Sequence, residues 1–324
     1  MYVFHSINHM KEISLNQLLN IKHPIIMAPM FLVTNTKMMI EALNSNIAAC
    51  IPALNYRTDK ELRNSILQIR SNTDSTGLGI NLIVNKSNKR MQQQLETCIE
   101  LEVDFIITSL GNPKQVIKLC KPKGIKVFCD VVEETYAKKV EKLGADAIIA
   151  VNKDAGGHAG KLSSLELIKR IKKSCSIPII SAGGIGNKEG VDEKLNEGFS
   201  GVSIGSPFIA CIESSVSQEY KTACIKYGKN DIVFTTKISG TPCTVINTPY
   251  VQKTGTTQNW LEKLISKSKI IKKWVKMITY FKGMKTVKNA AFSSTYKTVW
   301  CAGPSIEYTK DILPVKEIIK RFTN

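Results

Sequence analysis

Eight short apolar runs, each followed by a more polar stretch, dominate the first two-thirds of this 324-residue chain. Each run is rich in Ile, Val or Ala, and its apolarity is mostly continuous. Continuous apolarity is typical of parallel strands that are covered on both faces. The runs are PIIMAP (24–29), AACIP (48–52), GLGINLIV (77–84), DFIITSL (104–110), KVFCDV (126–131), AIIAVN (147–152), PIISAGG (178–184) and GVSIGSPF (201–208).

The stretches between these runs have helical spacing, and Gly144 is a plausible helix stop. Strands that alternate with helices over about 200 residues predict a (β/α)8 barrel. A doubly wound open sheet is the alternative, but eight evenly spaced strands favour closure. In such barrels the chemistry lies at the C-terminal ends of the strands. The helical stretches are 58–72, 89–101, 136–143, 165–171 and 191–195.

The alternation stops near residue 230, so we expect a barrel over 1–230 and an extension over 231–324 that covers its mouth. Residues 231–251 suggest loops and short strands. Residues 259–281 predict a long amphipathic helix with a lysine-rich face, either packed on its own protein, which we favour, or lying on an anionic membrane. Residues 312–322 predict a final helix that packs back on the barrel, with Pro314 in its first turn.

The net charge of +18 raises the question of nucleic-acid binding. Only six of the 45 basic residues are arginine, whereas specific nucleic-acid readers favour the bidentate fork of arginine. We therefore interpret the charge as a lysine-coated surface.

Nothing in the sequence indicates secretion, a membrane span or a metal site. The start of the chain lacks the basic and apolar segments of a secretory signal, and no apolar run approaches the roughly 20 residues of a spanning helix. The nine cysteines form no CxxC pair, which argues against a disulfide framework or zinc. We expect a cytoplasmic α/β protein in which Cys129 and Cys211 are buried.

Four of the predicted strands carry residues suited to hold a ligand, within the strand or at its end. Ala28-Pro29-Met30 follows the first run, and small apolar groups there would let a flat ligand lie against the backbone. Asn81 stands inside an apolar run, either in a structural hydrogen bond across the barrel or facing the edge of a heterocycle. Glycine turns follow the seventh and eighth runs, SAGGIG (181–186) and IGSPF (204–208). Backbone N–H groups at such turns predict a phosphate site.

One of only four histidines, His158, lies in the stretch DAGGHAGKL that follows the sixth run. Glycine leaves room for a ligand to approach, and a histidine exchanges protons near neutral pH. We see no Ser/His/Asp order, no catalytic carboxylate pair and no metal-ligand cluster. A phosphate site, one histidine and few charged groups favour a cofactor that carries the chemistry, and flavin mononucleotide (FMN) suits this arrangement.

Several motifs resemble those of the nitronate monooxygenases, which are FMN-dependent (β/α)8 barrels. They are HPIIMAPM, GINLIV, AGGHAGKLS, PIISAGGIG, GVSIGSPF and the C-terminal TYKTVWCAGPSIEYTKDILPVKEIIKRF. FMN-dependent enoyl-acyl-carrier-protein reductases share these motifs. The resemblance implies that His158 is the active-site histidine. The candidate cofactor-binding residues are Ala28, Pro29, Met30, Asn81, Gly160, Gly183, Gly184, Ile185, Gly205 and Ser206.

Two stretches depart from the family pattern. Phe31-Leu32-Val33 replaces the small residues usual after the first strand. Val151-Asn152-Lys153-Asp154 stands where the family often has Gln-Gly-x-Glu, so a flavin-contacting glutamine is missing. Asn152 is the candidate substitute for that glutamine.

The resemblance implies oxidation of an alkyl nitronate, such as that of 3-nitropropionate, by O2 to a carbonyl compound plus nitrite or nitrate. His158 would bind the nitronate or remove an α-proton from the neutral nitroalkane. NAD(P)H-dependent reduction of an enoyl thioester is the alternative. A third hypothesis, a nucleic-acid or membrane-surface binder, leaves the glycine turns without a purpose. We expect a small anionic substrate and O2 as partners, and we expect neither nucleic-acid binding nor stable membrane insertion. A homodimer is one oligomeric state compatible with the sequence.

Overall fold

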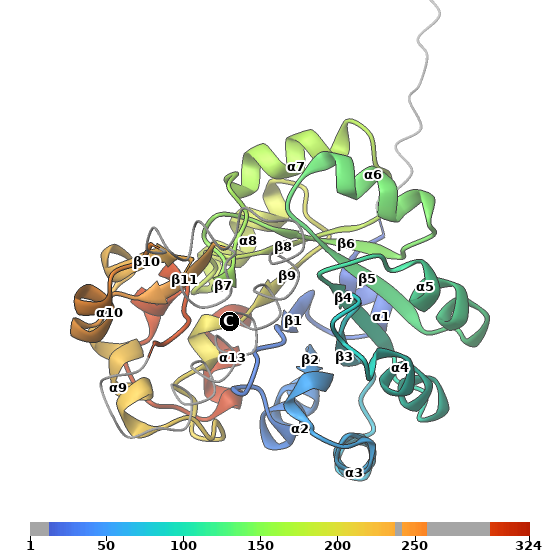
Figure 1. Cartoon of the computed structure of the whole chain (residues 1–324), viewed down its shortest axis with the longest axis horizontal. Coiled ribbons are helices and arrows are strands. Elements are labelled where there is room, and N and C mark those ends of the chain that lie inside the picture. Colours follow the sequence, from blue (N-terminus) through green and yellow to red (C-terminus); the bar gives the residue numbers. More distant parts are fainter. Residues whose placement is uncertain (1–12, 237–241, 258–298) are drawn as a thin grey trace, which may run out of the picture.

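In the computed structural model, eight parallel strands close into a barrel (Figure 1). The structure describes residues 13–236, 242–257 and 299–324. Each predicted apolar run contains one barrel strand, so the predicted (β/α)8 barrel is confirmed. In their order around the barrel the strands are β1 (Ile25–Met27), β2 (Ala48–Pro52), β3 (Leu78–Ile83), β4 (Phe105–Ser109), β5 (Lys126–Val131), β6 (Ala147–Val151), β8 (Ile179–Ala182) and β9 (Gly201–Ile204).

Helices surround the barrel, and their ends follow local capping chemistry. Helix α3 begins after Thr58, whose side chain accepts from the N–H of Glu61 while Glu61 bonds back to Thr58, forming a capping box. The same device starts α7 at Ser163. The helices of this layer are α2 (Thr36–Asn44), α3 (Asp59–Arg70), α4 (Met91–Glu100), α5 (Lys114–Cys120), α6 (Glu134–Lys142), α7 (Ser164–Lys172) and α8 (Lys188–Asn196).

Two apolar cores hold this arrangement together. One fills the barrel interior, where side chains such as Ile26, Phe105 and Phe128 pack in layers, and Leu15 of α1 (Leu15–Leu19) joins them. The larger core lies between the strands and the surrounding helices. Cys129 and Cys211 are buried, as predicted. Because the interior is full, a ligand can enter only at the ends of the strands.

The chain after the barrel forms a second layer on one side of the barrel mouth (Figure 1). Helix α9 (Gln218–Lys226) leads into β10 (Ile232–Thr235) and β11 (Cys243–Ile246), which pair antiparallel and precede α10 (Pro249–Thr254). These strands agree with the prediction of short strands over 231–251, which had not foreseen α10. The predicted helix over 259–281 lies outside the described residues.

The last helix, α13 (Val315–Thr323), returns to the outside of the barrel. It packs beside α2 and α8, and its Phe322 ring lies 5.9 Å from the ring of Phe208. Pro314 is the N-cap of this helix, so the helix begins after the proline and not before it as predicted. The end of the chain is thereby anchored on the barrel.

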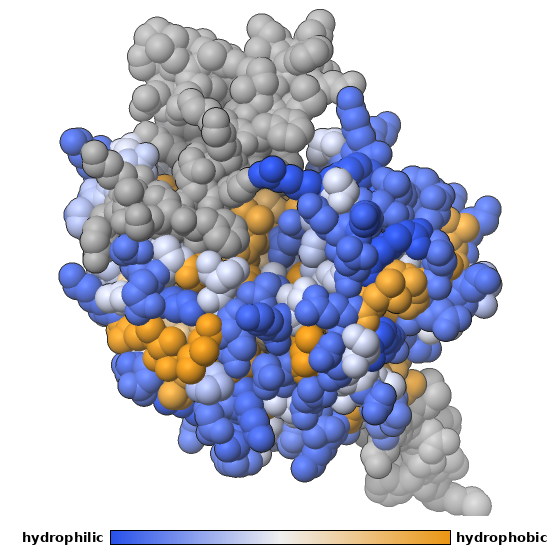
Figure 2. All heavy atoms as spheres, turned by 90° about the horizontal axis from the view of Figure 1, so that it is seen from below, coloured by the Kyte–Doolittle hydropathy of each residue, from blue (hydrophilic) through white to orange (hydrophobic). Residues whose placement is uncertain are grey.

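The face shown in Figure 2 is largely hydrophilic, with apolar residues in separate groups. Within the described ranges, none of the helices combines the length and the apolarity that crossing a membrane would require.

Candidate active site

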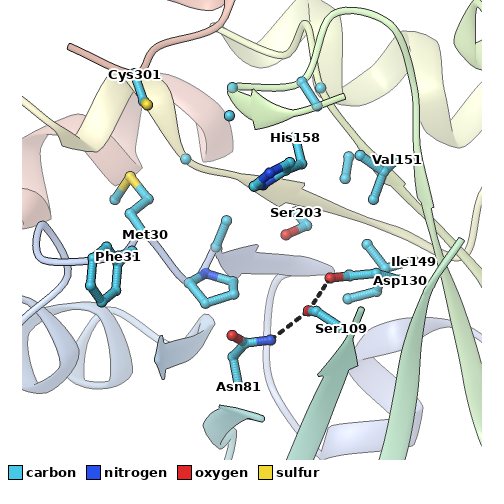
Figure 3. A pocket seen from close by; sticks show the side chains of 18 of the residues that line it. Met30, Phe31, Asn81, Ser109, Asp130, Ile149, Val151, His158, Ser203 and Cys301 are labelled. Carbon is cyan, nitrogen blue, oxygen red and sulfur yellow. Dashed lines mark hydrogen bonds between the residues drawn. The ribbon is translucent and has the colours of Figure 1, made fainter. Parts of the chain in front are cut away.

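A cavity of about 590 Å³ opens at the C-terminal end of the barrel strands. Its wall combines strand ends of the barrel with Cys243, Val299 and Cys301 of the extension. Figure 3 shows the ring of His158 on one side of this pocket and Asn81, Ser109 and Asp130 along another. The predicted location of the chemistry and the cavity therefore coincide.

The two glycine turns form one end of this cavity. The turn after β8 contains Gly183 and Gly184, with φ of +117° and +81°, a region that favours glycine. The turn after β9 contains Gly205 and leads into the 3-10 helix Ser206–Phe208.

Among the turn residues that line the cavity, five have backbone N–H groups with no hydrogen-bond acceptor within the described part of the chain: Gly183, Gly184, Ile185, Gly205 and Ser206. Backbone N–H groups need partners, so this cluster suits an anion that lies between the two turns. The Ser206 hydroxyl oxygen accepts from the Gly303 N–H at 2.8 Å, which leaves its own proton for a ligand.

Of the other predicted cofactor residues, Ala28, Pro29, Met30 and Asn81 line the cavity, whereas Gly160 does not. Gly160 is buried, and its N–H donates to the carbonyl of Asn152 at 3.1 Å. A Cβ at this position would overlap the carbonyl oxygen of Val151. The reason for glycine at position 160 is therefore close packing in the loop, and not clearance for a ligand.

His158 belongs to a strand, and not to a free loop as the sequence suggested. The two-residue strand β7 (Gly157–His158) pairs antiparallel with β11, which places His158 opposite Cys243. The ring is accessible from the cavity, but the surrounding protein desolvates it and thereby lowers the pKa of the imidazole. At pH 7 His158 is neutral and can both accept and donate a proton.

The glycines around His158 have different tasks. Gly157 has a φ of +76° and open space where a Cβ would be. At Gly156 a Cβ would lie 2.8 Å from the Ser206 hydroxyl oxygen and 3.0 Å from the Gly303 nitrogen. Glycine at position 156 therefore lets the loop after β6 lie close to the second glycine turn, at Ser206, and to the C-terminal segment, at Gly303.

Asn152, the candidate substitute for the missing glutamine, does not line the cavity. Its side-chain Nδ2 donates to the carbonyl of Gly183 at 3.0 Å, and its Oδ1 accepts from the N–H of Asp154 at 2.8 Å. Asn152 thus supports the first glycine turn from behind. Phe31, the other departure, does line the cavity and narrows its side at the β1 loop (Figure 3).

Ser109 and Asp130, which were not predicted from the sequence, line the cavity at the ends of β4 and β5. The Ser109 hydroxyl donates to Asp130, whose pKa burial raises to about 6 despite this bond. An aspartate inside the apolar run KVFCDV was the available signal, of the same kind that singled out Asn81.

The charge of the cavity is opposite to that of the protein. Asp130, Glu133 and Asp154 line it, and no lysine or arginine does so in the described ranges. An anionic ligand must therefore rely on backbone N–H groups and on His158.

The extension supplies two thiols to the wall. The Sγ atoms of Cys243 and Cys301 lie 3.7 Å apart, and this contact together with burial raises the pKa of Cys243. Tyr220 of α9 donates to the carbonyl of Cys301 and stacks on Trp300 with ring centroids 5.5 Å apart. These contacts fix the C-terminal segment against the cavity. The described residues contain no group of three or more side chains arranged to hold a metal ion.

Comparison with known proteins identifies a family that spans this architecture. A family model described as nitronate monooxygenase matches residues 12–324. A probable nitronate monooxygenase of Staphylococcus aureus is 27% identical over 283 residues, covering 74% of this chain and 79% of that protein. A (3aS,4S,5R,7aS)-5-hydroxy-7a-methyl-1-oxo-octahydro-1H-indene-4-carboxyl-CoA dehydrogenase of Rhodococcus jostii is 26% identical over 238 residues. That match covers 74% of this chain but just under two thirds, 66%, of the dehydrogenase.

Among solved structures, FabK from Thermotoga maritima superposes with a TM-score of 0.82 and 27% identity, covering 95% of this chain and 94% of FabK. A nitroalkane oxidase from Streptomyces ansochromogenes, 18% identical with a TM-score of 0.74, has the same fold over 95% of this chain and 96% of that protein.

Proposed function

The chain belongs to the nitronate monooxygenase family of oxidoreductases, and from this premise we propose that it is an FMN-dependent nitronate monooxygenase. The observation that carries the proposal is that a candidate phosphate site and His158 line the same cavity. Five N–H groups without acceptors in the described chain suit the phosphate of FMN, and the neutral His158 faces the same space.

The donor set fits this cofactor. A phosphate would accept from the N–H groups of Gly183, Gly184, Gly205 and Ser206, and the apolar floor of the barrel would support a flat ring. When bound, FMN supplies the capacity to accept electrons from a nitronate and to pass them to O2.

The residues of the chain would prepare the substrate for this chemistry. His158 can remove the α-proton of a neutral nitroalkane, or donate its N–H to an oxygen of the nitronate anion. Three carboxylates and no lysine or arginine line the cavity in the described ranges, so we assign the binding of the nitronate to the N–H of His158. The products are a carbonyl compound and nitrite or nitrate.

The alternative is a flavin-dependent NAD(P)H enoyl-acyl-carrier-protein reductase. Two observations favour it as second candidate: the Rhodococcus relative is named for a CoA thioester, and apolar side chains line the cavity mouth. Leu110 and Val132, at the ends of β4 and β5, are 44% and 46% exposed and could receive an acyl chain.

The visible spectrum of the purified protein tests the proposal. We expect a yellow protein with FMN in a 1:1 ratio. Added without O2, a nitronate should bleach the flavin absorbance and NADPH should not. Rapid bleaching by NADPH alone would favour the reductase, and a protein that cannot be reconstituted with FMN would refute both functions.

A further inference from the structure

Three polar side chains from neighbouring strands form a chain of hydrogen bonds on the cavity wall (Figure 3). Nδ2 of Asn81, on β3, donates to the carbonyl of Ile107 at 3.1 Å and to Oγ of Ser109 at 2.7 Å. Oγ of Ser109, at the end of β4, donates in turn to Oδ2 of Asp130 on β5. The chain of bonds therefore runs in one direction, from β3 to β5.

The direction of these bonds fixes what the wall offers to a ligand. The Ile107 carbonyl can only accept, so it requires the Asn81 amide nitrogen and settles the orientation of the amide. Both amide protons are then used, and so is the single proton of Ser109. Toward the cavity the wall therefore presents acceptors, namely Oδ1 of Asn81 and the carboxylate of Asp130.

Asp130 also brings a charge that the described residues do not compensate. It forms no ion pair with the described lysines and arginines, and burial raises its pKa to about 6, with the Ser109 bond acting in the opposite direction. It is therefore mostly ionised at pH 7.5. The titratable groups that face Asp130 or line the same cavity are Cys50 of β2, Cys129 beside it on β5, Glu133 and Tyr136 at α6, Asp154 of the β6 loop, His158 of β7, Tyr220 of α9, and Cys243 and Cys301 of the extension.

None of these groups supplies a positive charge at pH 7.5. Burial raises the pKa of the Cys50 and Cys129 thiols and of the Tyr136 hydroxyl, which keeps all three neutral, and His158 is neutral because its pKa is lowered. The remaining groups are the carboxylates of Glu133 and Asp154, the Tyr220 hydroxyl and the thiols of Cys243 and Cys301, and none of these can carry a positive charge.

The position of this wall relates it to the proposed cofactor. In the closed barrel β3 lies four strands from β8, and β4 lies four strands from β9; β8 and β9 carry the glycine turns. The third strand of the wall, β5, lies two strands from β8 and three from β9. With its phosphate at those turns, a flavin would have room to place its ring over the mouth, toward the wall formed by β3, β4 and β5. The pyrimidine edge of the ring carries an N–H donor between two carbonyl groups and needs polar partners, and an acceptor wall suits that N–H.

We propose that Asp130, held by Ser109 and Asn81, faces the pyrimidine edge of bound FMN and sets its reduction potential. The inference rests on the proposed flavin. Reduction adds negative charge to the ring, and a neighbouring carboxylate opposes that charge. Ionised Asp130 would thereby lower the potential and favour transfer of electrons from the flavin to O2.

The test is the midpoint potential of FMN bound to the full chain, measured from pH 5 to pH 8.5 in the wild type, Asp130→Asn and Glu133→Gln. At pH 8 we expect Asp130→Asn to shift the equilibrium toward reduced flavin by about tenfold or more, since a charge within 4–6 Å changes proton equilibria by that amount. Tenfold corresponds to about 30 mV for a two-electron couple.

The pH dependence separates a charge effect from a structural one. In the wild type, Asp130 becomes neutral as the pH falls through about 6. The difference in midpoint potential between the wild type and Asp130→Asn should therefore disappear at pH 5. Glu133→Gln, which removes an exposed carboxylate of the same cavity, should match the wild type at every pH. Ser109→Ala removes the bond that lowers the pKa of Asp130 and should move the transition to higher pH.

Two outcomes would overturn the inference. The quantity to compare is the equilibrium constant for flavin reduction in the wild type and in Asp130→Asn. If the two constants differ by less than threefold at pH 8, or by the same factor at pH 5 and pH 8, Asp130 does not act through its charge. If FMN binds, is bleached by a nitronate and shows such a result, only this inference fails. A wild type that does not bind FMN would overturn the proposed function and this inference together.

Discussion

Replacing Gly183 by alanine tests the turn that forms half of the candidate anion site. The residue has a φ of +117°, and an added Cβ would lie 2.5 Å from the nitrogen of Ala155 and 2.8 Å from its Cα, besides overlapping Oδ1 of Asn152. These are parts of the buried β6 loop and cannot rotate away. The substitution therefore requires movement of the backbone of that loop, of the turn, or of both.

The expected cost has two contributions. A non-glycine residue at such a φ loses about 1–3 kcal/mol. The Asn152 bonds to Gly183 and Asp154, 3.0 and 2.8 Å long, would be disturbed as well, at about 0.5–1.5 kcal/mol each. We expect Gly183→Ala to lower the free energy of unfolding by the sum of these contributions, about 2–6 kcal/mol.

Gly157→Ala is the matched control because it has a φ of +76° but open space around the added Cβ. Only backbone strain applies there, at about 1–2 kcal/mol. Urea unfolding followed by circular dichroism measures both values. A loss in Gly183→Ala no larger than in Gly157→Ala would refute the reasoning. Gly183→Ala should also weaken binding of FMN more than binding of riboflavin, which has no phosphate.

Three further predictions concern His158, Asp130 and the C-terminal segment beside the cavity. With a neutral nitroalkane as substrate, turnover requires neutral His158. Because the pKa of His158 is lowered, the turnover rate should persist as the pH falls to 6.5 and decrease only below that value. A pH–rate profile with its midpoint above 6.5 would contradict this prediction. Without flavin at pH 7.5, Asp130→Asn should raise the free energy of unfolding by up to about 3 kcal/mol, because a pKa raised from 3.8 to about 6 in the folded state penalises the ionised carboxylate. This gain should shrink below pH 6 and be absent below pH 3.8. Urea unfolding of the wild type and the variant at several pH values measures it. Trp300→Ala removes a fully buried ring stacked on Tyr220 and should cost about 3–5 kcal/mol in urea unfolding; a loss under 1 kcal/mol would show that the C-terminal segment is not anchored there.

The barrel was predictable because parallel strands covered on both faces leave a direct mark in the sequence. AACIP and KVFCDV became β2 and β5 with unchanged bounds, and the other six runs differ only at their ends. The strand ends in turn predicted that the two glycine turns and His158 would share one mouth. These inferences need only local pattern and the direction of parallel strands.

Features that depend on pairing between distant segments were not predictable. The strand that holds His158 exists only because β11, more than 80 residues later, lies beside it. Gly160 and Gly157 look alike in the sequence, yet one is packed against Val151 and the other faces open space. The bond between Ser109 and Asp130 likewise depends on the relative heights at which β4 and β5 end.

Nitrite release by protein of known FMN content tests the central claim most directly. The wild type and His158→Ala, matched in bound FMN, would be given a nitroalkane in the presence of O2, and nitrite would be measured per flavin. We predict equal FMN binding, steady nitrite release by the wild type and loss of most of it in His158→Ala. Equal rates in both proteins, or no nitrite from the FMN-loaded wild type, would contradict the account.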